Sequence, residues 1–102
     1  MRLERDFAAV RARGRRHTGE AVSVRSVENR AGRARLGIVS PRRYGNAVVR
    51  NRFRRVVRAA FRSIAATLPA RDWLVGPRED KREPSLAAVK ADLLAAAARS
   101  AR

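Results

Sequence analysis

Cysteine is absent from this sequence and acidic residues are scarce. Without cysteine, disulfides, thiolate metal sites and thiol nucleophiles are all excluded. The 102 residues include 9 Asp and Glu against 25 Lys and Arg, which gives a formal net charge of +16. Such an excess destabilises a compact chain by self-repulsion, so it indicates a partner that supplies negative charge. Nucleic acid is the first candidate for this partner, and an anionic membrane surface is the competitor.

Long apolar runs are missing as well. No stretch approaches the roughly 18 apolar residues of a membrane span, and Met1–Arg13 has no apolar core of the signal-peptide type. Glu4 and Asp6 argue against a transit peptide, because such peptides are poor in acids. We therefore expect a soluble, cytoplasmic protein with no membrane partner, folded as a single domain over residues 1–102.

Lysine is nearly absent too, since Lys81 and Lys90 are the only two cations that are not Arg. The planar guanidinium group suits phosphate because it can donate two parallel hydrogen bonds. A GC-rich genome would also raise the Arg content, and the sequence leaves both explanations open. The Arg residues are concentrated, however: 12 of them fall between Glu28 and Asp72, an interval without any carboxylate.

Hydrophobic periodicity and turn residues predict six structural elements. In chain order they are a helix at 2–13, strands at 20–27 and 35–40, a helix at 47–67 ended by Pro69, a buried central strand at 72–75 and a last helix capped by Ser85. A basic loop is expected at 42–46 and a charged linker at 78–84. This order predicts an α+β fold, an α/β sandwich in which helices pack on a small sheet.

The predicted helix at 47–67 divides into two faces. Its apolar residues fall within about 80° of one another on a helical wheel; they are Val49, Phe53, Val56, Ala60 and Ile64. The opposite face, about 60° wide, is polar and basic; it holds Asn51, Arg55, Arg58 and Arg62, with Arg50, Arg52 and Arg54 on the flanks.

The basic face of this helix contains no acid. A solvated helix face usually mixes charges of both signs three or four residues apart, whereas here Arg58 neighbours Arg54, Arg55 and Arg62. The sequence therefore favours polyanion binding over a merely solvated face. A membrane-surface helix is disfavoured, because the apolar face is needed to close the small core.

Catalytic chemistry is not predicted for the protein itself. The single histidine, His17, is not part of a recognisable arrangement of nucleophile, base and carboxylate in the sequence, and the acids at 79, 80 and 83 are interspersed with cations, as in a solvated linker. Protein-based nucleases usually cluster carboxylates around two metal ions. Among the aromatic residues, Tyr44 is expected to cap the core or to stack on a base, while Phe53, Phe61 and Trp73 are expected in the core.

The stretch from Gly45 to Arg62 resembles the signature of the bacterial ribonuclease P protein subunit. It reads GNAVVRNRFRRVVRAAFR, and the triplet Arg50-Asn51-Arg52 is its most characteristic part. Other segments resemble the same family, so that the resemblance spans most of the chain; they are Asp6-Phe7, Leu36–Ser40, Arg42-Arg43 and Asp72–Val75.

The resemblance implies both a fold and a function. The fold would be of the ribosomal protein S5 domain 2-like type, with a left-handed βαβ crossover, which is an exception to the usual hand. The protein would be a non-catalytic subunit that assists a catalytic RNA in cleaving the 5′ leader from precursor tRNA. The RNA would perform the hydrolysis with Mg²⁺, and the protein would bind no cofactor and need no obligatory protein partner.

The resemblance also implies which residues contact RNA. The residues expected to bind the RNA subunit are Arg42, Arg43, Asn46, Arg50, Asn51, Arg52, Arg54, Arg55, Arg58 and Arg62. Phe7, Arg11 and Arg25 would line a cleft for the leader, although the spacing of Phe7 is equally consistent with core packing. Arg11 and Arg25 stand where the family often has aromatics; guanidinium stacking and phosphate pairing would preserve the contact with the leader there, and the base preference is left open.

Two other functions remain compatible with the charge and size of the chain. A ribosomal or general RNA-structuring protein would share both properties. A binder of duplex DNA could insert a helical Arg into a major groove, but the sequence has no helix-turn-helix or zinc-ligand spacing.

Overall fold

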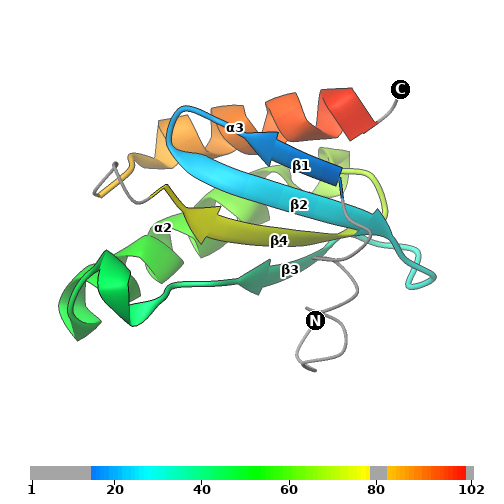
Figure 1. Ribbon diagram of the computed structural model, residues 1–102. Coiled ribbons are helices and arrows are strands. Elements are labelled where there is room, and N and C mark those ends of the chain that lie inside the picture. Colours follow the sequence, from blue (N-terminus) through cyan, green and yellow to red (C-terminus); the bar gives the residue numbers. More distant parts are fainter. Residues whose placement is uncertain (1–14, 79–82, 101–102) are drawn as a thin grey trace.

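A computed structural model describes residues 15–78 and 83–100, and of Arg15 and Ser100 it describes the backbone alone. The predicted helix at 2–13 lies outside the described residues. The elements are β1 (Arg15–Thr18), β2 (Val22–Glu28), β3 (Arg35–Ile38), the short 3-10 helix η1 (Arg42–Tyr44), α2 (Ala47–Ile64), the 3-10 turn η2 (Ala65–Thr67), β4 (Arg71–Pro77) and α3 (Leu86–Ser100). Figure 1 shows the two α-helices on one side of the sheet, with the other face turned toward the viewer.

The sheet has the strand order β1-β2-β4-β3. β2 pairs antiparallel with both β1 and β4, whereas β3 runs parallel to β4. A parallel pair needs a crossover connection, and α2 supplies it between β3 and β4. The α+β class, the sheet with helices packed on it, the βαβ crossover and the central position of the 72–75 segment are thereby confirmed.

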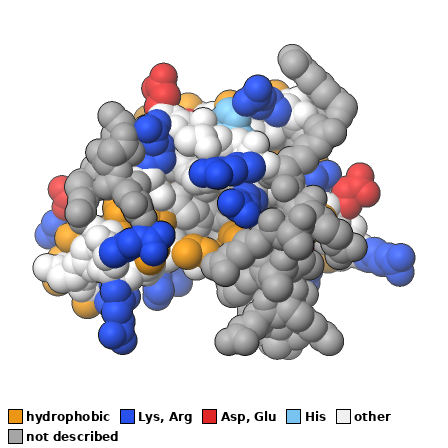
Figure 2. Space-filling model, viewed as in Figure 1, with side chains coloured by type: hydrophobic (Ala, Val, Ile, Leu, Met, Phe, Trp, Pro, Cys, Tyr) orange, Lys and Arg blue, Asp and Glu red, His pale blue; other side chains and the backbone are white. Residues whose placement is uncertain are grey.

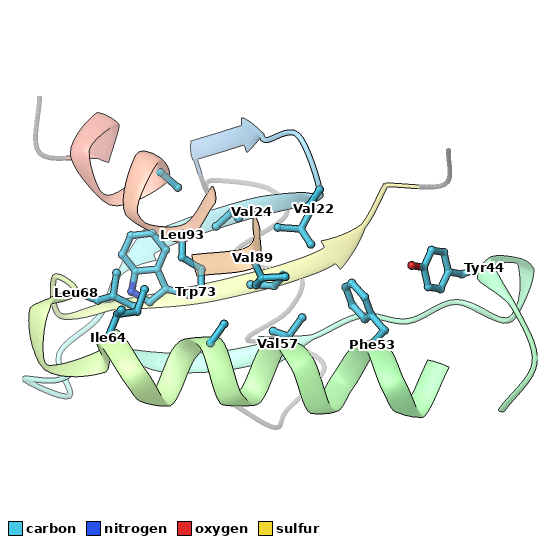
Figure 3. Packing of buried hydrophobic residues seen from close by; sticks show 14 residues of the cluster. Val22, Val24, Tyr44, Phe53, Val57, Ile64, Leu68, Trp73, Val89 and Leu93 are labelled. Atoms are coloured by element: carbon cyan, nitrogen blue, oxygen red, sulfur yellow. The ribbon is translucent and has the colours of Figure 1, made fainter. Parts of the chain in front are cut away.

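The core lies between the sheet and the two helices. In Figure 3, Val22 and Val24 from β2 and Trp73 from β4 point toward the side chains of the helices. Val89 and Leu93 of α3 are fully buried, as are Phe53 and Val57 of α2. Trp73 also donates its indole N–H to the Pro69 carbonyl oxygen at 3.2 Å. This hydrogen bond gives the buried indole nitrogen a partner.

Several packing predictions need correction in detail. Val57, which the wheel did not include in the apolar face, is fully buried, while Val49 and Val56 are half-buried at its edges. Phe61 is partly buried against the core rather than inside it. Of the two roles predicted for Tyr44, packing on the core is confirmed: its ring is buried edge-on to Phe53, with the ring centroids 5.4 Å apart.

The ends of the helices follow from local chemistry. Asn46 caps α2 by accepting a hydrogen bond from the Val49 N–H at 3.0 Å, and Ser85 caps α3 through the Ala88 N–H at 3.1 Å, as predicted. The α-helical part of the 47–67 segment ends at Ile64 and continues as the 3-10 turn. Leu68 is then extended, as a residue before proline prefers.

Among the helices that the structure describes, none combines the length and the apolar character that crossing a bilayer requires.

Candidate nucleic-acid interface

The outward face of α2 carries a row of basic side chains, which we call the α2 arginine row: Arg55, Arg58 and Arg62. All three are exposed, and Asn51 is exposed beside them, as the helical wheel predicted. Within residues 15–78 and 83–100, the structure gives these three guanidinium groups no ion pair and no hydrogen bond. The row is a set of like charges at helical spacing, which is locally destabilising.

The flanks of α2 behave differently from the row. Arg52 donates to Glu83 Oε1 at 2.8 Å, and both side chains are exposed. The helix itself carries no acid, as the sequence predicts, but Glu83, which lies beyond β4 in the chain, pairs with Arg52 on the flank of α2. Arg54 is half-buried, and its Nε donates to Ser40 Oγ at 2.8 Å.

Arg50 differs from every other arginine of α2. Its side chain is half-buried, and its Nε is a buried atom without a hydrogen-bond partner in the part of the chain that is described. A buried N–H without a partner costs free energy, so this atom favours any acceptor that approaches it.

Arg42, Arg43 and Asn46 lie at the amino-terminal end of α2, and all three are exposed. The segment predicted as a loop contains the 3-10 helix η1, anchored by the buried ring of Tyr44. This anchor explains why two adjacent Arg residues can be presented from an ordered backbone: the residue next to them is fixed in the core.

A second basic surface lies on the sheet face turned away from the helices. It is a hollow of about 560 Å³, which we call the sheet hollow; the residues that line it are Arg16, Thr18, Ser23, Arg25, Val39, Pro41, Arg43, Leu74, Gly76, Pro77 and Arg78. In Figure 2 basic side chains gather over the middle of this face, whereas the acidic side chains lie at its margins. Arg25, predicted to line the leader cleft, lines this hollow; Phe7 and Arg11 lie outside the described residues.

Two basic residues of the sheet hollow were missed in the sequence. Arg16 lies on β1, a strand without apolar residues, so that hydrophobic alternation could not reveal it. Arg78 follows β4 and donates to the Gly19 carbonyl oxygen at 3.1 Å. The one sequence signal for Arg16 was its position three residues before the 19–22 turn, which matches that of Arg25 three residues after it.

The described residues contain no group of three or more His, Cys, Asp or Glu placed to hold a metal ion. His17 Nδ1 lies 3.2 Å from Arg99 Nη1, and this contact connects β1 with α3.

Comparisons with known proteins agree with the resemblance in the sequence. The family model described as Ribonuclease P matches residues 1–101. A ribonuclease P protein component from Chlamydia trachomatis is 32% identical over 91 residues, which cover 88% of this chain and 75% of that protein. One from Shouchella clausii is 44% identical over 62 residues, covering 60% and 51% of the two chains.

Solved structures give the same answer at the level of the fold. The ribonuclease P protein from Thermotoga maritima superposes with a TM-score of 0.85 at 33% identity, over 97% of this chain and 94% of that chain. A ribonuclease P protein from Staphylococcus aureus shares the fold, with a TM-score of 0.83 at 23% identity. The family model, the relatives and the solved structures agree with the signature on the Arg-rich helix. The chain belongs to the bacterial ribonuclease P protein family.

Proposed function

We propose that this chain is the RNA-binding subunit of ribonuclease P and that α2 binds the RNA subunit of that enzyme. The observation that carries the proposal is the α2 arginine row, a set of exposed cations on a helix whose other face is locked into the core. Because the core fixes the direction in which the row points, the row is preorganised for a partner. RNA phosphates supply the negative charge that the described residues do not supply to Arg55, Arg58 and Arg62.

The flanking residues extend this surface toward the amino-terminal end of α2. Arg42, Arg43, Asn46, Arg50, Asn51, Arg52 and Arg54 make up the rest of the proposed contact with the RNA subunit. Arg52 donates to Glu83 through Nη1, and its other guanidinium N–H groups can donate to a phosphate beside it.

The sheet hollow is the proposed site for the 5′ leader of precursor tRNA. Single-stranded RNA is bound by basic grooves that follow the backbone, together with surfaces on which bases stack. The hollow combines the guanidinium groups of Arg16, Arg25 and Arg78 with apolar side chains such as Leu74. Arg25 in place of an aromatic favours contacts with phosphate, and Phe7 and Arg11 complete the proposed cleft.

Hydrolysis is assigned in this proposal to the RNA subunit and the Mg²⁺ that it binds. The protein then contributes by holding the leader and the RNA subunit in the reactive arrangement, which is catalysis by positioning. It binds no cofactor of its own and needs no further protein partner.

Reconstitution with the cognate ribonuclease P RNA tests the proposal. At low Mg²⁺ concentration, cleavage of precursor tRNA at the 5′ end of the mature sequence should be faster with the protein than with the RNA alone. Equal rates with and without the protein would contradict the proposal. Cosedimentation of the protein with ribosomes, in place of stimulated cleavage, would support the alternative of a ribosomal or RNA-structuring protein.

A further inference from the structure

A second, smaller hollow lies on the flank of α2, next to the arginine row. It has a volume of about 340 Å³, and we call it the α2 side groove; it is lined by Arg52, Phe53, Arg55, Val56, Glu83 and Pro84. The groove therefore lies between α2 and the residues Glu83 and Pro84, which precede α3. The sheet hollow shares no lining residue with it.

The α2 side groove combines an apolar floor with a charged rim. Phe53 and Pro84 are buried and Val56 is half-buried, so carbon atoms form the bottom of the groove. Arg52, Arg55 and Glu83 are exposed and form its edges. An apolar hollow on a highly charged surface favours a ligand that has a flat apolar face next to negative charge.

We propose that the α2 side groove binds one unstacked nucleobase of the RNA subunit, with the adjacent phosphates on Arg52 and Arg55. This inference rests on the proposed function and names a nucleotide-binding site within it. Proteins that read RNA usually take single-stranded bases out of the stack and bury their faces against apolar or guanidinium surfaces. The groove offers both kinds of surface, and its volume lies near the lower end of the range for small-ligand sites.

Glu83 gives the α2 side groove a hydrogen-bond acceptor. Its carboxylate is held by Arg52 Nη1 at 2.8 Å, and its backbone adopts the left-handed conformation, with φ of 49°, which non-glycine residues adopt rarely. An ionised carboxylate only accepts hydrogen bonds. It therefore favours a base edge that presents N–H groups, such as an exocyclic amino group, at the rim of the groove.

The charge around the groove favours RNA over a peptide as its occupant. An apolar peptide would cover Val56, and it would also remove water from around Arg52 and Arg55. It would bring no negative charge to compensate these two cations. A nucleotide brings a phosphate with every base. The groove also continues directly into the α2 arginine row through Arg55, so one RNA strand can contact both.

Filling the groove tests the inference without changing any charge. Val56→Phe should lower the affinity for the cognate ribonuclease P RNA about tenfold, because a stacked base contributes on that order. The dependence of the affinity on salt should stay unchanged. Leu94→Phe, a similar enlargement at an exposed position of α3, is the matched control and should leave the affinity as it is. Thermal melting checks that both variants fold.

Val56→Cys provides a second measurement that does not depend on tolerance of a large side chain. The chain contains no cysteine, so V56C carries a single thiol. Alkylation of that thiol by iodoacetamide should be slowed at least fivefold by saturating cognate RNA, whereas the thiol of L94C should react at the same rate with and without RNA.

Unchanged affinity of Val56→Phe together with an unprotected thiol in V56C would overturn the inference. If the wild-type protein still binds the cognate RNA and stimulates cleavage, the proposed function survives that result. If the wild-type protein does not stimulate cleavage, that result contradicts the proposed function instead. The two failures are therefore distinguishable.

Discussion

At the scale of single residues, Asp92 joins α3 to the turn between β1 and β2. It is buried in α3 and accepts three backbone hydrogen bonds from the 19–22 turn, from the N–H groups of Glu20 at 3.1 Å, Ala21 at 2.8 Å and Val22 at 2.9 Å. A side chain at Gly19 would overlap its carboxylate, so glycine is required there by close approach. The turn that Asp92 fixes also accepts the hydrogen bond from Arg78 in the sheet hollow.

Replacement of Asp92 should therefore destabilise the fold strongly. Asp92→Ala leaves buried N–H groups without a partner, and we expect a loss of about 3 kcal/mol in the free energy of unfolding. Urea unfolding followed by circular dichroism measures this change. Asp92→Asn keeps one acceptor oxygen and should lose less. An unchanged midpoint for Asp92→Ala would show that the turn is held by other contacts.

Asp72 makes the stability dependent on pH. Hydrogen bonds from Arg35, at 2.6 and 2.7 Å, hold the pKa of the Asp72 carboxyl below its ordinary value of 3.8, against the opposing effect of burial, and a hydrogen bond from Asn29 adds to the lowering. A carboxyl whose pKa is lower in the folded than in the unfolded state stabilises the fold above the unfolded value. That contribution is lost as the pH falls through the folded pKa.

The wild-type protein should therefore lose its stability advantage over Asp72→Asn in acid. We expect the difference between their free energies of unfolding to be constant from pH 7 to about pH 5 and to shrink below the ordinary value of 3.8. Thermal or urea unfolding at several pH values measures the difference. A gap that stays constant down to pH 3 would contradict the assignment.

At the scale of elements, the amino-terminal end of α2 joins a structural role to a predicted role in binding. The side chain of Asn46 caps the helix, yet Asn46 is also among the residues proposed to contact RNA. Aspartate caps a helix as well as asparagine does, and its charge is favourable at a helix amino terminus. The same charge repels phosphate.

Two substitutions at position 46 separate these roles. Asn46→Ala should cost about 1 kcal/mol in the free energy of unfolding, because the cap is lost. Asn46→Asp should keep the stability of the wild type and weaken binding to the cognate RNA. Equilibrium unfolding and a filter-binding assay measure the two quantities. Undiminished RNA affinity of Asn46→Asp would place Asn46 outside the contact.

Periodicity predicts those elements that bury a face. α2, α3, β2 and β3 carry apolar residues at the spacing of their own structure, whereas β4 shows the continuous apolar run of a central strand. The sequence places all five within a few residues. β1 has the sequence Arg-Arg-His-Thr and is held by pairing with β2 rather than by an apolar face. Its pairing partner is a property of the fold, which local sequence does not encode.

At the scale of the whole molecule, the direction of the α2 arginine row could be predicted from the sequence, and its surroundings could not. The wheel separates Arg55, Arg58 and Arg62 from the core because helix geometry is local. The approach of Glu83 to Arg52, the α2 side groove and the pairing of Arg35 with Asp72 all join segments that are at least 27 residues apart. Such contacts depend on the order of the strands, which the sequence indicates only by resemblance.

The salt dependence of binding to the cognate ribonuclease P RNA tests most directly whether the α2 arginine row contacts phosphate. If the protein contacts five to seven phosphates, the logarithm of the affinity should fall with the logarithm of the salt concentration with a slope of about −3.5 to −6. Arg58→Ala with Arg62→Ala should make this slope about 1.4 to 1.8 less steep. Arg30→Ala with Arg33→Ala removes the same charge from the exposed turn between β2 and β3 and should leave the slope as in the wild type. Equal slopes for the two double variants would contradict the account.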